Sequence, residues 1–562
     1  MSTLAFGNAL VEKHRAMLDA ARAATRERTF WSAFPEHFAP YGEDGAAAGK
    51  AAFEACLGNE FPLEQPDVDG HVGAERSPYG FELGITYPHT PTGALLAAAT
   101  AAMPDWRDAG ADARTAVCIE ILTRLNERSH EIAHAVMHTT GQAYVMAFQA
   151  GGPHAQDRAL EAIAYAYDEM TRHVGSAIWE KPQGKRPPLR MQKTFRLAPR
   201  GVALVIGCNT FPTWNGYPGL FASLVTGNSV VVKPSSRAVL PLAITVAVAR
   251  EVLTEAGFEP DLVTLAADAP GERRGSELAQ RPEVKIIDYT GSSEYGEWLE
   301  RNAPQAVVFT EKAGVNTVVI DSTDDYEGML GNLAFTLSLY SGQMCTTPQN
   351  VIVPRSGIET DAGHKSLDEV GADLAAAIDK LLSDDGRANA ILGAIATDAI
   401  LERIERAGSF GQTLLASRSI EHPEHPGASV RAPALIAVDG DADGPHLTEQ
   451  FGPIAFLVAV DDTAAALRLL GETTSRFGAI TAGVYSTDGL VLEQAELVAL
   501  EAGVALSENL TGAVFVNQSA AFSDFHATAA NPAANASLTD VAFVASRFHV
   551  VQSRRPIEAD AA

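Results

Sequence analysis

The chain of 562 residues carries 42 basic and 70 acidic side chains, a formal net charge of -28, and 46% hydrophobic residues. This composition predicts a large globular protein, and the strong negative charge argues against nucleic acid as a partner. No stretch approaches the roughly eighteen apolar residues of a membrane span, and the N-terminus lacks the apolar segment of a signal peptide, so we expect no membrane contact. The 4 cysteines are scattered without paired spacing, which indicates reduced thiols and a cytoplasmic protein.

The pattern of apolar residues divides the chain into segments. Residues 1–90 begin with a helical pattern and continue with Gly, Pro and acidic residues, which predicts an N-terminal helical extension. Residues 91–175 are again helical, and short apolar runs then alternate with helical stretches over 199–315, which is typical of an open α/β domain around a parallel sheet. A second α/β stretch covers 316–532. The tail at 539–553 alternates apolar and polar residues like a strand, and we expect it to pair outside its own domain.

A small polar loop, Ser341–Thr347, places Cys345 ahead of the strand-like run Asn350–Pro354. Small flanking residues let backbone amides or a positive charge approach a thiol and stabilise the thiolate, which is its nucleophilic form. We therefore expect Cys345 to be an ionised nucleophile. The alternative is an inert buried cysteine.

Glu311 ends the apolar run Val307–Thr310. A carboxylate where a strand runs out is well placed to face a cleft, and we expect partial burial to raise its affinity for a proton and suit it to general-base work. A surface acid is the alternative.

Two glycine-containing turns could approach a phosphate. The first, Tyr289–Gly296, follows a predicted strand and opens a helix, whose N-terminus offers free amides and partial positive charge. The second contains Gly271 and Gly275 at another predicted helix start. Lys233 ends a further strand, from which its ammonium could reach a ribose.

These pieces resemble, in order, the aldehyde dehydrogenase superfamily over roughly residues 92–550. The matching stretches are GVALVIGCNTFPTWNGYPG, TGNSVVVKPSS, IIDYTGSSEYG, TEKAGVN, GQMCTTPQNVIVP and TEQFGPIAF. Within the superfamily the chain resembles the phenylacetic acid degradation branch, PaaN type, which is related to the dehydrogenase half of PaaZ. The resemblance implies an α/β fold with a Rossmann-type cofactor domain, an α/β catalytic domain, and a small β oligomerisation element from residues 176–198 and 533–562, hence a homodimer.

By position, the resemblance implies that Cys345 is the nucleophile and Glu311 the general base. The implied cofactor-binding residues are Lys233, Ser236, Gly271, Gly275, Thr290, Gly291, Ser292, Glu449 and Phe451. Glu449 and Phe451 match the pair that grips the nicotinamide ribose, and Gly291 with Ser292 matches the pyrophosphate turn.

Three departures from the family pattern stand out. Counting back from Lys233 without gaps, the asparagine that donates to the oxyanion is replaced by Thr210, with Asn209 and Asn215 close by, so any of the three could be the donor beside the Cys345 amide. The usual Leu-Gly-Gly after the base is Lys-Ala-Gly at residues 312–314.

The third departure concerns cofactor choice. Ser236 stands where many NAD-preferring members carry a glutamate that binds both ribose hydroxyls. Because this repulsive charge is missing and Arg237, Arg273 and Arg274 could pair with a 2'-phosphate, we expect NADP to be preferred, with NAD as the alternative.

A competing motif lies in the helical region. His130, Glu131 and His134 fit H-E-x-x-H, the zinc motif of metallopeptidases, and Glu161 could serve as a third ligand. Residues 114–141, however, look like one ordinary amphipathic helix that matches the family helix ahead of the cofactor strands. We therefore expect no metal site here.

The resemblance implies oxidation of an aldehyde to a carboxylic acid through a thioester on Cys345. The implied substrate is a ring-cleavage semialdehyde carried on coenzyme A, 3-oxo-5,6-dehydrosuberyl-CoA semialdehyde, and phenylacetaldehyde or another aryl aldehyde is the alternative. A CoA-acylating dehydrogenase and a non-catalytic binding protein also stay open. The hydratase half of PaaZ has no counterpart in this chain, so a separate enoyl-CoA hydratase would be the partner.

Overall fold

Two β-sheets, built from consecutive parts of the chain, organise the computed structural model, which describes residues 3–269 and 271–557. The first sheet has the strand order β11-β10-β7-β8-β9 with every pair parallel. Its strands are β7 (Val202–Ile206), β8 (Val230–Lys233), β9 (Val263–Leu265), β10 (Val284–Thr290) and β11 (Val307–Glu311). The β7 residues are all buried, as expected for a central strand with helices on both faces.

Helices pack on this first sheet and on one another. They are α3 (Thr92–Asp108), α4 (Gly110–Glu127), α5 (Ser129–Thr140), α6 (Tyr144–Gln149), α7 (Ala155–Thr171), α8 (Pro212–Val225), α9 (Leu240–Glu255), α10 (Arg274–Ala279) and α11 (Ser293–Asn302). The prediction of one continuous helix over residues 114–141 is wrong, because the structure has two helices there. The chain leaves helical geometry at Arg128 (φ -102°, ψ 16°), so α4 and α5 are separate helices.

The second sheet has the order β17-β20-β21-β14-β12-β22-β23, with β17 as an antiparallel edge strand. Its strands are β12 (Thr317–Ile320), β14 (Asn350–Pro354), β17 (Gln412–Leu415), β20 (Ala434–Asp439), β21 (Ile454–Val460), β22 (Thr481–Tyr485) and β23 (Ala505–Glu508). The helices of this part are α12 (Tyr326–Ser338), α13 (Leu367–Leu381), α14 (Asp385–Leu392), α15 (Asp398–Arg406), α16 (Thr463–Phe477) and α17 (Gly489–Ala502). Short strands complete it: β13 (Ser322–Thr323), β15 (Ile358–Thr360), β16 (Gly363–Lys365), β18 (Ser419–Ile420) and β19 (Val430–Arg431).

The N-terminal extension is only partly helical. It contains α1 (Thr3–Glu27), α2 (Gly45–Cys56), β1 (Gly70–Val72), β2 (Arg76–Ser77), β3 (Phe81–Glu82) and β4 (Tyr87–His89). The strands form two small antiparallel pairs, β1 with β4 and β2 with β3, which the helical expectation missed. The buried Glu75 carboxylate accepts hydrogen bonds from the backbone of Val239 and Leu240 at the start of α9, and thereby anchors the extension to the first sheet.

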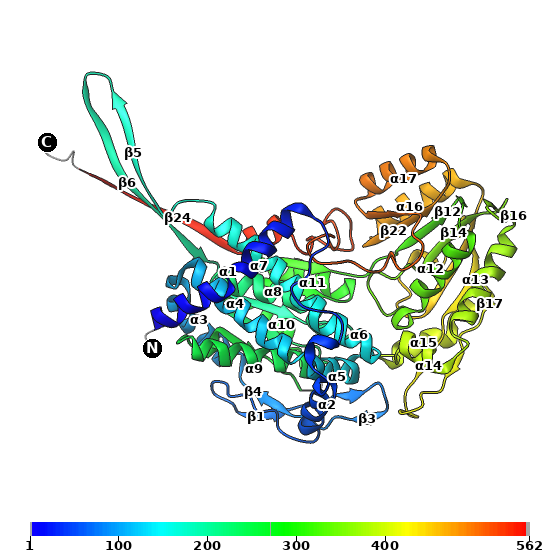
Figure 1. The fold of residues 1–562 in the computed structure, drawn as a ribbon, viewed down its shortest axis with the longest axis horizontal. Coiled ribbons are helices and arrows are strands. Elements are labelled where there is room, and N and C mark those ends of the chain that lie inside the picture. Colours follow the sequence, from blue (N-terminus) through cyan, green and yellow to red (C-terminus); the bar gives the residue numbers. More distant parts are fainter. Residues whose placement is uncertain (1–2, 270, 558–562) are drawn as a thin grey trace.

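A three-stranded arm projects from the body (Figure 1). It consists of β5 (Ser176–Gln183), β6 (Arg186–Pro199) and β24 (Phe548–Pro556), and β24 pairs antiparallel with β6. The strand expected over 539–553 therefore begins late, because residues 541–545 form the short helix α18 (Val541–Ala545), capped by the Asp540 side chain. Residues 558–562 of the expected element lie outside the described residues.

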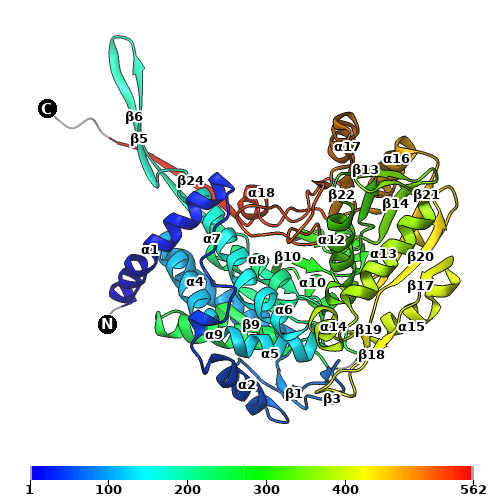
Figure 2. The ribbon, with the colours of Figure 1, turned by 45° about the vertical axis from the view of Figure 1, so that its right-hand side comes forward.

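The chain after β23 returns from the second sheet to the first before it enters the arm (Figure 2). Arg547, whose side chain is fully buried, fixes this return by donating to both carboxylate oxygens of Asp288 on β10, at 2.6 and 2.8 Å. Its guanidinium also lies over the rings of Phe309 and Phe543. Within the described ranges, none of the helices is long and apolar enough to cross a membrane.

Candidate active site

Glu311 lies at the carboxyl end of β11, where the first sheet opens toward the second part of the chain. The returning C-terminal segment runs beside it: Ala534 forms an antiparallel bridge with Glu311, and the Asn535 side chain accepts from the Thr310 amide at 2.7 Å. The Glu311 side chain is only 5% exposed. The backbone around this carboxylate is thus held by β10 on one side and by a distant C-terminal segment on the other.

Cys345 lies in the loop between α12 and β14, on the second sheet. Tyr340 and Ser341 adopt left-handed backbone geometry (φ 52° and 50°), which turns the chain sharply before the thiol. The Asn316 side chain then donates to the carbonyls of Cys345 at 2.7 Å and Thr347 at 3.1 Å. This loop is therefore a fixed structure that presents the thiol to the end of β11.

The two parts of the chain meet in a buried cluster of Glu311, Cys345 and His526, whose functional atoms all lie within 4.8 Å of one another. His526 Nε2 is 3.2 Å from Glu311 Oε1 and 3.8 Å from Cys345 Sγ. Asn215 Nδ2 on α8 donates to Glu311 Oε2 at 3.1 Å. The structure brings together the predicted nucleophile and base, and adds a histidine that the sequence analysis did not single out.

The charge states in this cluster differ from both sequence expectations. Burial raises the pKa of Glu311, but the His526 charge and the hydrogen bonds from His526, Cys345 and Asn215 outweigh it and hold that pKa below its usual range. Burial, followed by the Glu311 charge, raises the pKa of the Cys345 thiol well above its usual range. The expectations of a Glu311 with raised proton affinity and of a resting Cys345 thiolate are both wrong for this structure. The His526 charge and the hydrogen bonds favour the Glu311 carboxylate, while burial and that carboxylate disfavour the thiolate.

The three oxyanion candidates occupy different environments. Both polar atoms of the Asn215 side chain already have partners: its oxygen accepts from the Cys208 thiol at 3.6 Å, and its nitrogen donates to Glu311. Asn215 therefore orients the base. The Thr210 backbone carbonyl accepts from Gln142, and no hydrogen bond between the described residues joins Thr210 to Cys345. Both amide atoms of Asn209 are buried with no partner among the described residues.

The adenosine end of the predicted cofactor cleft lies beside β8 and α10. Lys233 Nζ is 2.8 Å from Asp268 Oδ2, and Oδ1 of this largely buried carboxylate has no hydrogen-bond partner among the described residues. Gly275 lies in the first turn of α10, where a Cβ atom would come within 2.9 Å of the Tyr295 hydroxyl and 3.9 Å of the Lys233 side chain. The missing side chain and the unpartnered acceptor fit a bound dinucleotide.

The other predicted cofactor residues line up along the same edge. Thr290 ends β10 directly opposite Glu311, and the Gly291 amide donates to the Glu311 carbonyl at 3.0 Å. A Cβ on Gly291 would meet the Tyr289 hydroxyl at 2.4 Å. Ser292 caps α11 through its side chain. A side chain at position 291 would therefore collide with Tyr289, and the turn requires glycine there.

The 2'-phosphate partners expected from the sequence are only partly available. Ser236 and Arg237 lie exposed in the turn after β8, and Gly271 (φ 87°) and Arg273 are exposed before α10. Arg274 is buried, and its guanidinium donates to the carbonyls of Ala267 and Thr90. The expectation that Arg274 could meet a phosphate is wrong, because its side chain is buried and its two terminal nitrogens donate to backbone carbonyls.

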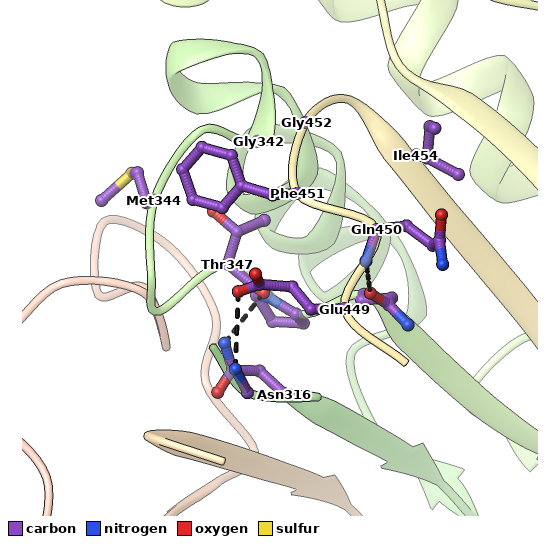
Figure 3. A pocket seen from close by; sticks show the side chains of 12 residues that line it. Asn316, Gly342, Met344, Thr347, Glu449, Gln450, Phe451, Gly452 and Ile454 are labelled. Atoms are coloured by element: carbon purple, nitrogen blue, oxygen red, sulfur yellow. Dashed lines mark hydrogen bonds between the residues drawn. The ribbon is translucent and has the colours of Figure 1, made fainter. Parts of the chain in front are cut away.

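Glu449 and Phe451 line a cleft beside the Cys345 loop, together with Asn316, Met344 and Thr347 (Figure 3). Burial raises the pKa of Glu449 to about 7, against the opposing effects of the Gly314 amide and the Arg403 charge. The predicted ribose-gripping pair thus lines a cleft beside the loop that carries Cys345, and its role in cofactor binding stays a prediction.

The H-E-x-x-H residues have other partners. His130 pairs with the Tyr144 hydroxyl at 2.7 Å, and Glu131 forms two contacts of 2.7 Å with Arg128. Glu161, the suggested third ligand, pairs with Arg158 at 2.8 Å instead. Burial lowers the pKa of His134 to about 4, as expected for a neutral histidine packed between aromatic rings.

Comparison with known proteins identifies the family of this chain. The model of the aldehyde dehydrogenase family matches residues 90–522. The chain belongs to the aldehyde dehydrogenase family. It is an enzyme with the α/β fold of that family, and a nicotinamide dinucleotide, NADP or NAD, is its cofactor.

A crystal structure of an NAD-dependent aldehyde dehydrogenase from Burkholderia multivorans is 56% identical, with a TM-score of 0.97 over 98% of this chain and 100% of that chain. A 1-pyrroline-5-carboxylate dehydrogenase from Thermus with bound NAD is 20% identical, with a TM-score of 0.70 over 94% of this chain and 99% of that one, and shares the fold. Among curated relatives, an N-succinylglutamate 5-semialdehyde dehydrogenase from Chromobacterium violaceum is 27% identical over 75% of this chain and 81% of its own length. These curated relatives are named for another semialdehyde, so the phenylacetate branch stays a prediction.

Three residues of the site escaped the sequence analysis. His526 lies in a small-residue segment with no periodicity, and nothing near it in the sequence indicates a reactive group. Asp268 follows β9 and could have been found as an acid at a strand end, by the reasoning used for Glu311. Asn316 lies within the family-like stretch TEKAGVN, but its role in holding the cysteine loop depends on a contact across the fold.

Proposed function

We propose that the protein oxidises an aldehyde to a carboxylic acid through an acyl thioester on Cys345. The observation that carries this proposal is the buried cluster in which Cys345 and Glu311 lie within 4.8 Å of each other beside the cleft at Glu449. The Cys345 sulfur bonds to the aldehyde carbon, and the carbonyl electrons move to oxygen, toward the donors. A nicotinamide dinucleotide bound in the cleft would accept the hydride.

Glu311 then acts on the thioester. Its carboxylate, ionised at neutral pH because its pKa is held low, takes a proton from water as the water oxygen attacks the acyl carbon. Asn215 fixes the orientation of the carboxylate. The free amide of Asn209 is the second oxyanion donor in this proposal, in place of the Thr210 hydroxyl.

Product analysis tests this reaction. Hydrolysis predicts carboxylic acid without added coenzyme A, and Cys345→Ala should abolish oxidation while it leaves dinucleotide binding intact. Strict dependence of turnover on coenzyme A would instead identify a CoA-acylating dehydrogenase and overturn the role of Glu311.

For the substrate we propose a semialdehyde with a second, polar end, and 3-oxo-5,6-dehydrosuberyl-CoA semialdehyde is the member that the sequence resemblance implies. The names of the curated relatives support a semialdehyde but point to N-succinylglutamate 5-semialdehyde. A panel of these two compounds and phenylacetaldehyde, compared by kcat/KM, tests the choice. A preference for phenylacetaldehyde would favour the aryl aldehyde alternative.

For the cofactor, the sequence predicts that NADP is preferred. The surroundings of Lys233 favour the opposite choice, and we propose that NAD binds more tightly than NADP. The Asp268 oxygen left without a partner at Lys233 can accept from a ribose hydroxyl, and its charge repels a 2'-phosphate. The name of the Burkholderia relative supports the same choice. Asp268→Asn should raise kcat/KM for NADP relative to NAD, and wild-type kcat/KM higher with NADP than with NAD would contradict this proposal.

For the assembly we propose a homodimer that uses the β5–β6–β24 arm. Ile178, Leu189, Val550 and Val551 are exposed apolar side chains on this arm. Light scattering after gel filtration should give twice the chain mass of 59.4 kDa, and deletion of 176–198 should give monomer. In the phenylacetate setting we propose a separate enoyl-CoA hydratase as the partner.

A further inference from the structure

His526 occupies a constrained position at the nucleophile. Its side chain is 2% exposed, and its backbone amide and carbonyl both pair with Leu538, at 2.7 and 2.8 Å. The ring packs edge-on against Trp214, with centroids 4.7 Å apart. The backbone pairing and the tryptophan leave the Nε2 atom aimed between Glu311 and Cys345.

We propose that His526 is a further catalytic residue: in the neutral ring that carries its proton on Nδ1, Nε2 accepts the proton of the Cys345 thiol as the sulfur attacks the aldehyde. This inference rests on the proposed function only for the identity of the electrophile. The S–H bond breaks and an Nε2–H bond forms. The sulfur electron pair makes the S–C bond, and the carbonyl electrons move to oxygen.

The charges around the thiol favour a base other than Glu311 if that carboxylate is to stay ionised for the later attack of water. A Cys345 thiolate would lie within 4.8 Å of the Glu311 carboxylate, and two anions this close in a buried site repel each other strongly. Protonated His526, in contact with both groups, supplies the compensating positive charge. The other ionisable side chains near the thiol, Glu449 and Cys208, provide no positive charge.

Apart from Glu311, no other described neighbour of the His526 ring can take the thiol proton in its place. Trp214 is uncharged, and the Arg158 guanidinium lies beyond it, 5.6 Å from the tryptophan ring centroid. Arg158 is paired with Glu161 and with the carbonyl of Asp524. His526 thus lets the site use two bases in turn, the imidazole for the thiol and the Glu311 carboxylate for water.

The test measures the thiol directly and needs no aldehyde. The rate of Cys345 alkylation by iodoacetamide, assigned by peptide mass, is followed from mildly acidic to alkaline pH in wild type, His526→Gln and the matched control His154→Gln. His154 is an exposed histidine that pairs with Glu36, away from the cluster. We expect alkylation of His526→Gln to be at least ~10-fold slower than wild type at about pH 7, with the gap closing at alkaline pH, and the control to match wild type.

A second variant protects the test against a folding defect. His526→Ala leaves space beside Cys345, and added imidazole should restore its alkylation rate in proportion to the imidazole concentration, which a merely structural histidine would not allow. Superimposable pH profiles of wild type and His526→Gln, or a slow His526→Ala that imidazole does not rescue, would overturn the proposal. Because alkylation is measured without substrate, these outcomes are independent of whether the proposed aldehyde oxidation is correct.

Discussion

The substitution Glu311→Gln separates the two halves of the proposed reaction. Glutamine keeps the shape of the buried side chain, and its amide oxygen can still accept from Asn215 Nδ2, so we expect the loop and the sheet edge to stay in place. The variant loses only the carboxylate that takes the proton from water. Acyl enzyme should therefore form normally and hydrolyse slowly.

The expected size of the effect follows from the neighbours of Glu311. Removal of a general base typically slows a step by about 100-fold to 10,000-fold. His526 Nε2 lies 3.2 Å from Glu311 Oε1 and remains as a nearby base, so we expect a loss of steady-state turnover at the lower end, about 100-fold.

Stopped-flow absorbance of reduced dinucleotide is the assay. Glu311→Gln should give a burst of about one equivalent per active site followed by a slow steady rate, whereas the surface control Glu493→Gln should behave as wild type. Near wild-type turnover in Glu311→Gln would refute the base assignment. A missing burst in a variant that still binds the dinucleotide would show that Glu311 acts before the thioester forms. This result would refute the assignment of the thiol proton to His526 and of the water proton to Glu311.

Three further predictions concern the cofactor cleft and the fold. Gly275→Val should weaken dinucleotide binding at least ~10-fold by calorimetry, because a side chain there meets the Tyr295 hydroxyl, and an unchanged Kd would remove α10 from the cofactor site. Glu449, with a pKa of about 7, is ionised above that pH and protonated below it, so KM for the dinucleotide should rise as pH falls through about 7, and Glu449→Gln should flatten this dependence. Arg547→Met leaves the buried Asp288 charge unpaired and should lower the free energy of unfolding in urea by about 3–5 kcal/mol. The double variant Arg547→Met/Asp288→Asn should recover part of this loss, and an additive double variant would contradict the pairing.

Local sequence was enough to predict the elements that carry the chemistry. The apolar run before Glu311 forms β11, and the small-residue loop around Cys345 lies ahead of β14, as predicted. Both results depend on short-range rules: a buried parallel strand needs a continuous apolar run, and a reactive loop needs small residues. The N-terminal extension was less predictable, because its small strands are stabilised by contacts such as Glu75 with the start of α9, which local patterns do not encode.

The sequence by itself determined the fold class, the family, the candidate nucleophile and base, and the order of the cofactor residues. Only the tertiary structure decided the charge state of the thiol, the commitment of Asn215 to the base and of Arg274 to backbone carbonyls, and the place of His526. The physical reason is that a pKa depends on burial and on charges within a few ångströms, whatever their distance along the chain. His526 comes 181 positions after Cys345, and the returning C-terminal segment alone brings its ring to the sulfur.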